Sequence, residues 1–140
     1  MQGNEIFGPF FGMILLTLIV WIALYVRRIG YLKRNRIHAQ KVSTPDKVVD
    51  VIPEHVQYPA YNFRNLLELP VLFYVLCLYL YVSGNVDTLY VIAAWLFVGL
   101  RAVHSTIQCT TNIVMQRFTA YMAGAVVLWF MVLRAALGAF

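Results

Sequence analysis

Arginine outnumbers acid among the polar residues that interrupt the apolar stretches of this chain. Arg64, Arg101 and Arg117 accompany a single acidic residue, Glu68. A guanidinium group binds a carboxylate through two parallel hydrogen bonds. A surplus of guanidinium groups in a partly dry site therefore predicts a binding site for an anionic ligand. The alternative is that Glu68 is a structural charge, paired with Arg101 or Arg64 to hold the helices together.

The spacing of the polar residues is typical of helix faces. Asn65 and Glu68 are three residues apart, and Arg117 precedes Tyr121 by four. A longer polar stripe advances in steps of three, four and four residues, and it consists of Arg101, His104, Gln108 and Asn112. Such a stripe is unstable against lipid. It must face other helices, another subunit or a water-filled pocket. Because a single four-helix bundle has little interior in which to hide all of it, we expect contacts between subunits to cover the stripe.

The composition is that of an integral membrane protein. Of the 140 residues, 61% are hydrophobic and 12% are charged, whereas a soluble domain has about 25% charged residues. Since a spanning helix needs about 20 apolar residues, the chain holds four spans, at about 6–26, 66–82, 88–112 and 118–137. We predict an all-α membrane protein with a single domain over 1–140, a bundle of four transmembrane helices.

Basic residues concentrate between the first two predicted spans. The loop at 27–64 holds eight lysines and arginines, and the loop between the second and third spans holds none. Because basic loops stay in the cytoplasm, we expect the 27–64 loop on the cytoplasmic side and both termini on the opposite side. The basic run then reports topology, and no nucleic-acid partner is expected.

The 27–64 loop is expected to begin as a helix and to end as an irregular segment. Residues 27–41 are expected to extend the first helix until Thr44-Pro45-Asp46 breaks it, because proline cannot continue a helix. The segment 48–61 contains two prolines. We expect it to return across the membrane surface.

Metal and cysteine chemistry are not expected. No second histidine or cysteine lies at metal-ligand spacing to His104. Cys77 and Cys109 stand in helical stretches and are interpreted as packing residues.

Three short motifs occur in order along the predicted spans. The segment 62–73 reads Asn-Phe-Arg-Asn-Leu-Leu-Glu-Leu-Pro-Val-Leu-Phe, with an Asn and a Glu three residues apart. The third span contains Arg101-Ala-Val-His104, and the fourth begins near Arg117-Phe-Thr-Ala-Tyr121. Together these motifs resemble the second, third and fourth helices of the MAPEG family, the membrane-associated proteins in eicosanoid and glutathione metabolism. The chain resembles a bacterial-type or divergent member.

This resemblance implies a homotrimer that binds glutathione between neighbouring subunits near the cytoplasmic face. By resemblance, Arg117 is the catalytic residue and stabilises the glutathione thiolate. The residues assigned to glutathione binding are Arg28, Arg64, Asn65, Glu68, Arg101, His104, Gln108 and Tyr121. At the end of the first helix, Arg27 is the alternative to Arg28. The expected partners are further copies of the chain, membrane lipids and a lipophilic small-molecule substrate.

The implied activity is that of a glutathione transferase or a lipid-hydroperoxide peroxidase, in which the thiolate attacks a lipophilic electrophile. Two positions depart from the family pattern. Tyr61 stands where family enzymes often have an arginine, and Gln108 stands where several have a tyrosine. Both differences bear on glutathione binding. The alternative is a non-catalytic MAPEG-like scaffold, as a lipid-binding trimer or as a small subunit of a larger membrane complex.

Overall fold

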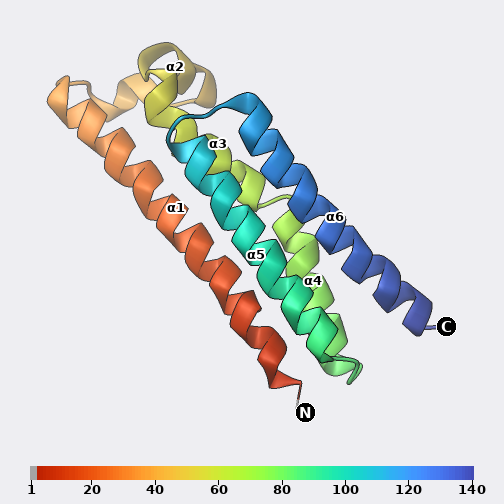
Figure 1. Ribbon diagram of the computed structural model, residues 1–140. Coiled ribbons are helices and arrows are strands. Elements are labelled where there is room, and N and C mark those ends of the chain that lie inside the picture. Colours follow the sequence, from red (N-terminus) through yellow and green to blue (C-terminus); the bar gives the residue numbers. More distant parts are fainter. Residues whose placement is uncertain (1–2) are drawn as a thin grey trace.

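The computed structural model describes residues 3–140 as a bundle of helices (Figure 1). Its elements are η1 (Asn4–Ile6), α1 (Phe7–Arg34), η2 (Ala39–Val42), α2 (Pro45–Val51), α3 (Glu54–Leu66), α4 (Leu69–Val82), α5 (Thr88–Cys109) and α6 (Val114–Gly138). Among these described residues, four stretches are long and apolar enough to cross a membrane, and these are Asn4–Arg34, Glu54–Val82, Thr88–Cys109 and Val114–Gly138. The predicted fold, an all-α bundle of four membrane helices, is confirmed.

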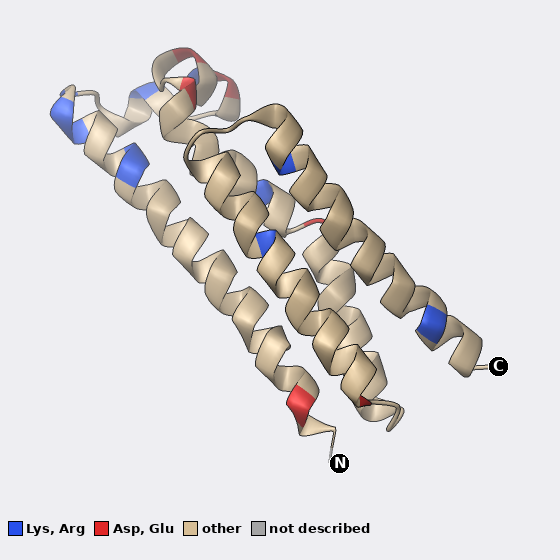
Figure 2. Ribbon diagram, viewed as in Figure 1, with Lys and Arg blue, Asp and Glu red and all other residues tan. Residues whose placement is uncertain are grey.

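The two ends of the bundle differ in charge. The start of α1 and the end of α6 lie at one end, which we call the terminal end. The helix α2 lies at the opposite end, which we call the α2 end (Figure 1). Lysine and arginine residues gather at the α2 end (Figure 2). The charge asymmetry of the sequence therefore becomes an asymmetry between the two ends of the bundle.

The helix α1 ends earlier than the sequence predicts. The prediction extends the first helix to residue 41, but α1 ends at Arg34. The next three N–H groups donate back to carbonyl groups of the last turn, and Arg36 has a left-handed φ of 52°. This turn satisfies carbonyl groups that a helix end leaves free. Pro45, which we expected to end this helix, is instead the first residue of α2, a position that suits proline.

The second span begins earlier than the sequence predicts. The expected return loop at 48–61 is wrong, because this segment contains the end of α2 and most of α3. The two prolines misled the prediction. Pro53 caps the start of α3, and Pro59 lies inside the helix and is buried. The Gln57 side chain is buried as well and donates a hydrogen bond of 2.8 Å to the carbonyl of Ile52, which ties α3 to the preceding turn.

A break at Leu67 and Glu68 divides the second span into α3 and α4. Pro70 explains its position, because proline has no N–H and its ring clashes with the carbonyl four residues earlier. That earlier residue is Leu66, the last residue of α3. Glu68 departs from helical geometry with a ψ of −106°. The third and fourth spans, α5 and α6, have no comparable break within the described residues.

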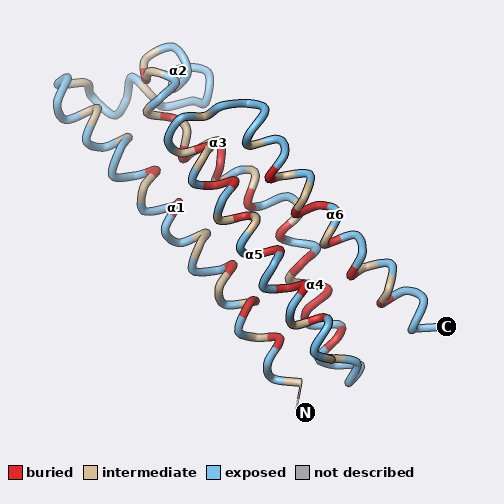
Figure 3. Tube along the Cα trace, viewed as in Figure 1, coloured by how far each residue is buried: buried red, intermediate tan, exposed pale blue. Residues whose placement is uncertain are grey.

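The helix α5 is the most buried element of the bundle (Figure 3). It packs along α6 and against α1 and α3. Toward α4, the rings of Phe73 and Phe97 stack with centres 4.8 Å apart. Toward α1, Trp95 lies over Gly8 and Gly12, where an added Cβ would come within 3.2 Å of the indole. These glycines therefore let α1 approach the large side chain.

Different residues determine where α5 begins and where it ends. Asp87 caps the start, and its Oδ1 accepts a hydrogen bond of 2.9 Å from the N–H of Tyr90, as expected of an N-cap aspartate. The sequence predicts helix to residue 112, but α5 ends at Cys109. Asn112 has a left-handed φ of 50°, a conformation that asparagine tolerates better than most residues. It therefore belongs to the turn between α5 and α6.

Candidate functional site

The polar stripe of α5 is buried inside a single chain. Arg101, His104 and Gln108 are 0%, 3% and 7% exposed, respectively. Asn112, the fourth member that we expected, lies outside the helix and is half-buried. We expected one four-helix bundle to offer too little interior for the stripe and other subunits to cover it. This expectation is wrong, because α3 and α6 cover it within the same chain.

Arg101 is the largest fully buried side chain among the described residues. Its Nη2 donates to the side-chain oxygen of Asn65 and, at 3.5 Å, to the carbonyl of the same residue on α3. Its Cζ lies 5.5 Å from the centre of the Tyr121 ring on α6, within the range of a cation–π contact. In the part of the chain that the structure describes, Nε and Nη1 have no hydrogen-bond partner. The guanidinium is therefore dry and only partly satisfied.

Glu68 does not supply the missing partner. Within residues 3–140, neither Arg101 nor Arg64 forms an ion pair with it, so the predicted structural ion pair is wrong. The reason is the break in the second span, which leaves Glu68 exposed at the cap of α4. The carboxylate is accessible at the surface of the single chain. It remains free to meet a cation that arrives from outside the bundle.

His104 has a partner at each ring nitrogen. Its Nδ1 lies 2.9 Å from the carbonyl oxygen of Arg117, and its Nε2 lies 2.9 Å from the side-chain amide of Gln108. Because the Arg117 carbonyl can only accept, Nδ1 carries a hydrogen and donates it. This contact fastens α5 to the first turn of α6. His104 is therefore placed to hold the helices and the Tyr121 ring, whose centre is 5.8 Å from its own.

Arg117 lies in the first turn of α6 and is half-buried. Its Nη1 donates to the side-chain oxygen of Asn112. Asn112 thus acts as a positioning group for Arg117 from the turn between α5 and α6. The remaining donors of Arg117 are free of ion pairs within the described chain. One face of this guanidinium is held, and the rest is available to an anion.

Asn62 belongs to the same buried layer and was not singled out from the sequence. It is fully buried, and its Oδ1 accepts a hydrogen bond of 3.3 Å from Ser105. Its Nδ2 lies 3.5 Å from the sulfur of Cys109. It stands three residues before Asn65, on the same face of α3. That spacing was a signal in the sequence, and it marks a second amide that ties α3 to α5.

Arg28 and Arg64 lie apart from this layer, around a cavity at the α2 end. The cavity has a volume of about 540 Å³ and is formed by α1, α3 and the segment that includes η2 and α2. Tyr61 and Asp46 line it together with the two arginines. Arg64 and Asn65 are neighbours in the sequence, so α3 carries one side chain toward the cavity and the next toward Arg101. The predicted binding residues therefore form two adjacent groups.

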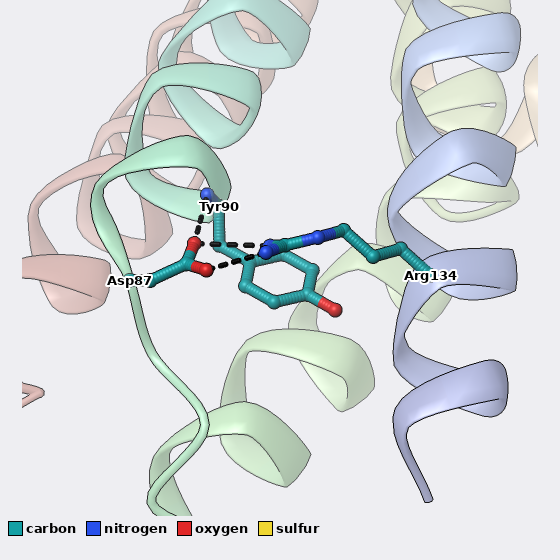
Figure 4. A network of polar contacts seen from close by, with 3 residues as sticks. All are labelled: Asp87, Tyr90 and Arg134. Carbon is teal, nitrogen blue, oxygen red and sulfur yellow. Dashed lines mark hydrogen bonds and ion pairs between the residues drawn. The ribbon is translucent and has the colours of Figure 1, made fainter.

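A third polar cluster lies at the terminal end and was missed by the sequence reading (Figure 4). Arg134 of α6 forms an ion pair with Asp87 through contacts of 2.5 and 3.0 Å. Its Cζ also lies 4.2 Å from the centre of the Tyr90 ring. The hydrogen bonds from Arg134 are the main reason that the pKa of Asp87 lies below its ordinary value. A lone arginine near the end of the last span was the available signal.

Two cysteines lie in the helices, and the groups that could bind a metal ion are dispersed among the described residues. Cys77 is buried in the core and Cys109 is half-buried, and both are free thiols. Among residues 3–140, no three histidine, cysteine, aspartate or glutamate side chains gather closely enough to hold a metal ion.

These features define an integral, multi-pass membrane protein whose buried polar layer combines arginine with amide and tyrosine side chains. The sequence model of the MAPEG family matches residues 6–137. Since this match covers nearly the whole chain, the chain belongs to the MAPEG family, as the motifs of α3, α5 and α6 predicted. No curated protein and no solved structure matches the chain.

Proposed function

We propose that the protein is a glutathione-dependent membrane transferase or lipid-hydroperoxide peroxidase. The observation that carries the proposal is the environment of Arg101, a fully buried cation with two donor nitrogens, Nε and Nη1, that have no hydrogen-bond partner within residues 3–140. A buried charge without a partner is costly, so an anionic ligand would stabilise this layer. Family membership makes glutathione the leading candidate, because it carries two carboxylates.

The charges around Arg101 match the ends of glutathione. Arg64 and Arg28 line the neighbouring cavity and would take carboxylates. Glu68 is exposed and free of an ion pair among the described residues, so it would take the ammonium group. Asn65 joins the two regions because it contacts Arg101 and adjoins Arg64. The peptide would then extend from the cavity toward Arg101.

Arg117 would act on the sulfur. A thiol has a pKa of about 8.5, and a nearby guanidinium lowers it by favouring the thiolate, which is the nucleophile. Asn112 holds one side of Arg117 and leaves its other donors free for the sulfur. The thiolate would then attack a lipophilic electrophile that enters from the bilayer. In the peroxidase reaction the thiolate would attack the distal oxygen of a hydroperoxide and break the O–O bond, and the leaving alkoxide would take a proton from water to become the alcohol. The sulfur would become a sulfenic acid, which a second glutathione would reduce to the disulfide with release of water.

The proposal is tested by glutathione binding and turnover of the detergent-solubilised protein. Glutathione at about 100 times its dissociation constant should stabilise the fold by about 2.7 kcal/mol. Turnover should be measured with a generic lipophilic electrophile and with a lipid hydroperoxide. Arg117→Ala should keep the assembly and lower the rate of thiol transfer at least about tenfold, equivalent to about 1.4 kcal/mol. Arg34→Ala, at an exposed position of the same charge, is the matched control.

A non-catalytic scaffold is the second candidate, and the surroundings of His104 favour it. Gln108 occupies Nε2 of this ring, and the Arg117 carbonyl occupies Nδ1. A polar layer that satisfies itself in this way can serve packing alone. If the protein shows no stabilisation by glutathione and no turnover with either substrate class, the scaffold replaces the enzyme as the better account. Arg117 is then an anchor for lipid headgroups.

We further propose that the protein forms a homotrimer. Irregular backbone at membrane depth is tolerated only where protein or water covers it. The break at Leu67 and Glu68 is exposed in the single chain, so another copy is a suitable cover. Family membership supplies the number three. Mass measurement in a mild detergent tests the number, and a cross-link between copies from a cysteine at position 67 tests the surface. A monomeric mass without a cross-link would exclude the trimer.

We propose that the α2 end faces the cytoplasm. The support is the concentration of basic residues at that end (Figure 2). Both termini would then lie on the opposite side. A cysteine introduced at Lys41, which is exposed, should react with a membrane-impermeant reagent from the cytoplasmic side. If this cysteine reacts only from the opposite side of the membrane, the α2 end does not face the cytoplasm.

A further inference from the structure

The end of α1 forms a cavity that the proposed thiol chemistry does not use. This cavity has a volume of about 470 Å³, within the range of small-molecule sites. Its walls come from the last turns of α1 and from the residues that follow this helix. It shares no lining residue with the cavity of Arg28 and Arg64. A ligand here would therefore occupy a site of its own.

A tight turn after α1 shapes the cavity. The N–H of Ile37 donates to the carbonyl of Leu32 over 2.9 Å, and the N–H of Arg36 donates to the carbonyl of Lys33 over 3.2 Å. These two bonds define a Schellman motif, in which the side chains at the positions of Leu32 and Ile37 commonly meet. Both side chains are half-buried and line the cavity. The motif therefore supplies an apolar wall.

Arg36 occupies the position of this motif that usually belongs to glycine. Its φ is 52°, a left-handed conformation that a side chain disfavours. The turn itself gives no reason for an arginine, since glycine would form it with less strain. The residue does line the cavity beside Lys33. The placement of a guanidinium in this cavity is therefore the feature that an arginine adds.

Positive charge lines the cavity without compensation. Lys33 and Arg36 line it together with the imidazole of His38, and all three residues are exposed. Within residues 3–140, neither Lys33 nor Arg36 forms an ion pair, and no acidic residue lines the cavity. Figure 2 shows basic residues gathered at this end of α1. An anion with more than one negative charge is therefore the complementary ligand.

The position of the cavity along α1 makes it accessible to lipid headgroups and to solutes. The helix carries no charge from Phe7 to Val26, and Arg27 and Arg28 follow. Lys33 lies beyond Arg28 by about 7.5 Å along the axis, at 1.5 Å per residue. The headgroup layer extends about 5–7 Å beyond the hydrocarbon. With Arg28 at the edge of the hydrocarbon, the cavity lies at the outer side of the headgroup layer.

We propose that this cavity binds a phosphate monoester. Such a group carries about 1.5–2 negative charges at neutral pH, which match the fixed charges of Lys33 and Arg36. Its three terminal oxygens accept hydrogen bonds from the lysine, the arginine and the imidazole of His38, whereas a carboxylate offers only two oxygens. The molecule that carries the phosphate, a membrane lipid or a solute, lies against Leu32 and Ile37. The site does not depend on glutathione binding.

Two binding measurements on the detergent-solubilised full chain test the site and distinguish the two sources of phosphate. Isothermal titration compares glycerol phosphate, a soluble monoester, with the diester glycerophosphoglycerol. Native mass spectrometry compares retention of the lipids phosphatidic acid and phosphatidylglycerol, which differ in the same way. We expect the monoester to bind at least about fivefold better than the diester, because the extra charge meets a second basic residue. A preference in the titration identifies a soluble ligand, and a preference among the lipids alone identifies a membrane lipid.

Arg36→Gly separates binding from folding. Glycine suits the left-handed position, so the unfolding temperature should not fall, whereas binding of the monoester should weaken at least about fivefold through loss of one cation. Lys33→Gln should weaken binding to a similar extent. Arg34→Gln is the matched control, because Arg34 is exposed on the same helix and does not line the cavity. Binding by this variant should not change.

Three results would overturn the proposal. Equal affinity for monoester and diester in both measurements, or no binding in either, would show that the cavity does not recognise a doubly charged phosphate. Full binding by Arg36→Gly would place the ligand elsewhere. A loss with Arg34→Gln as large as with Lys33→Gln would show attraction to the basic surface as a whole.

Discussion

The positive charges of Arg101 and Arg134 have opposite surroundings. Arg134 is partly exposed, and its guanidinium meets the carboxylate of Asp87. Arg101 is fully buried, and its hydrogen-bond partner among the described residues is the neutral Asn65. An exposed ion pair contributes little to stability, whereas a dry cation without a counter-charge is costly. The comparison indicates that the first arrangement is complete and that the second is prepared for an anion.

The largest effect on stability is expected at the support of Arg101. Asn65→Leu removes the hydrogen bonds to a buried cation, and bonds of this kind contribute about 1.5–3 kcal/mol. The free energy of unfolding should fall by about 3 kcal/mol, as measured by denaturant titration in detergent. Asn65→Asp is the contrasting variant and should stabilise the chain, because it adds the missing carboxylate. If Asn65→Asp lowers the free energy of unfolding as much as Asn65→Leu does, Arg101 does not lack a counter-charge.

Arg101→Met tests whether the buried cation serves a ligand. Replacing buried charge with an apolar side chain is often neutral or stabilising, so the free protein should unfold at an equal or higher temperature. Stabilisation by glutathione, about 2.7 kcal/mol at a 100-fold excess over the dissociation constant, should disappear. A strongly destabilised free protein would instead assign Arg101 a purely structural role. Arg34→Met, at an exposed position, is the control.

The Asp87–Arg134 pair should have a smaller, pH-dependent effect. Asp87→Asn should cost less than about 1 kcal/mol at neutral pH, because the pair is exposed. Since Arg134 lowers the pKa of Asp87 below 3.8, the wild type should hold this advantage at neutral pH and lose it as the pH falls below that value. Thermal unfolding of both proteins between neutral and acidic pH measures the difference. If the stability advantage of the wild type over Asp87→Asn grows as the pH falls, the predicted direction of the pH dependence is wrong.

Glu68→Gln should have the smallest effect on the fold. Glu68 is exposed and forms no ion pair among the described residues, so the unfolding temperature without ligand should remain unchanged. If Glu68 meets the ammonium of glutathione, the dissociation constant of glutathione should rise about tenfold, equivalent to about 1.4 kcal/mol. Isothermal titration with glutathione separates the two quantities. A large drop in the unfolding temperature of Glu68→Gln would show that Glu68 supports the fold.

The sequence predicted the four spans because hydrophobic length is a local property that composition reports directly. It also placed Arg101, His104 and Gln108 on one face of α5, because helical spacing determines which side chains share a face. It did not show that α3 and α6 of the same chain cover this face. That result depends on how each helix is rotated in the bundle, which periodicity alone leaves open.

The errors around the second span have a different origin. Pro53 and Pro59 were read as loop signals, although one precedes a helix and the other lies within it. The proline that does interrupt the span is Pro70, and it displaces Glu68 from the helix. The ion pair of Asp87 and Arg134 joins residues 47 positions apart. No local pattern predicts such a contact.

The length of α1 determines where the cavity of Arg28 and Arg64 meets the membrane. The helix has 28 residues and measures about 42 Å at 1.5 Å per residue, about 12 Å more than the hydrocarbon thickness of a bilayer. The ordinary helix tilt of about 20° absorbs only a few ångströms of this excess. With its uncharged turns in hydrocarbon, α1 reaches the boundary near Arg28, and its last turns stand in water. A water-soluble ligand can therefore enter this cavity without crossing hydrocarbon, while a lipophilic molecule reaches the bundle from the side.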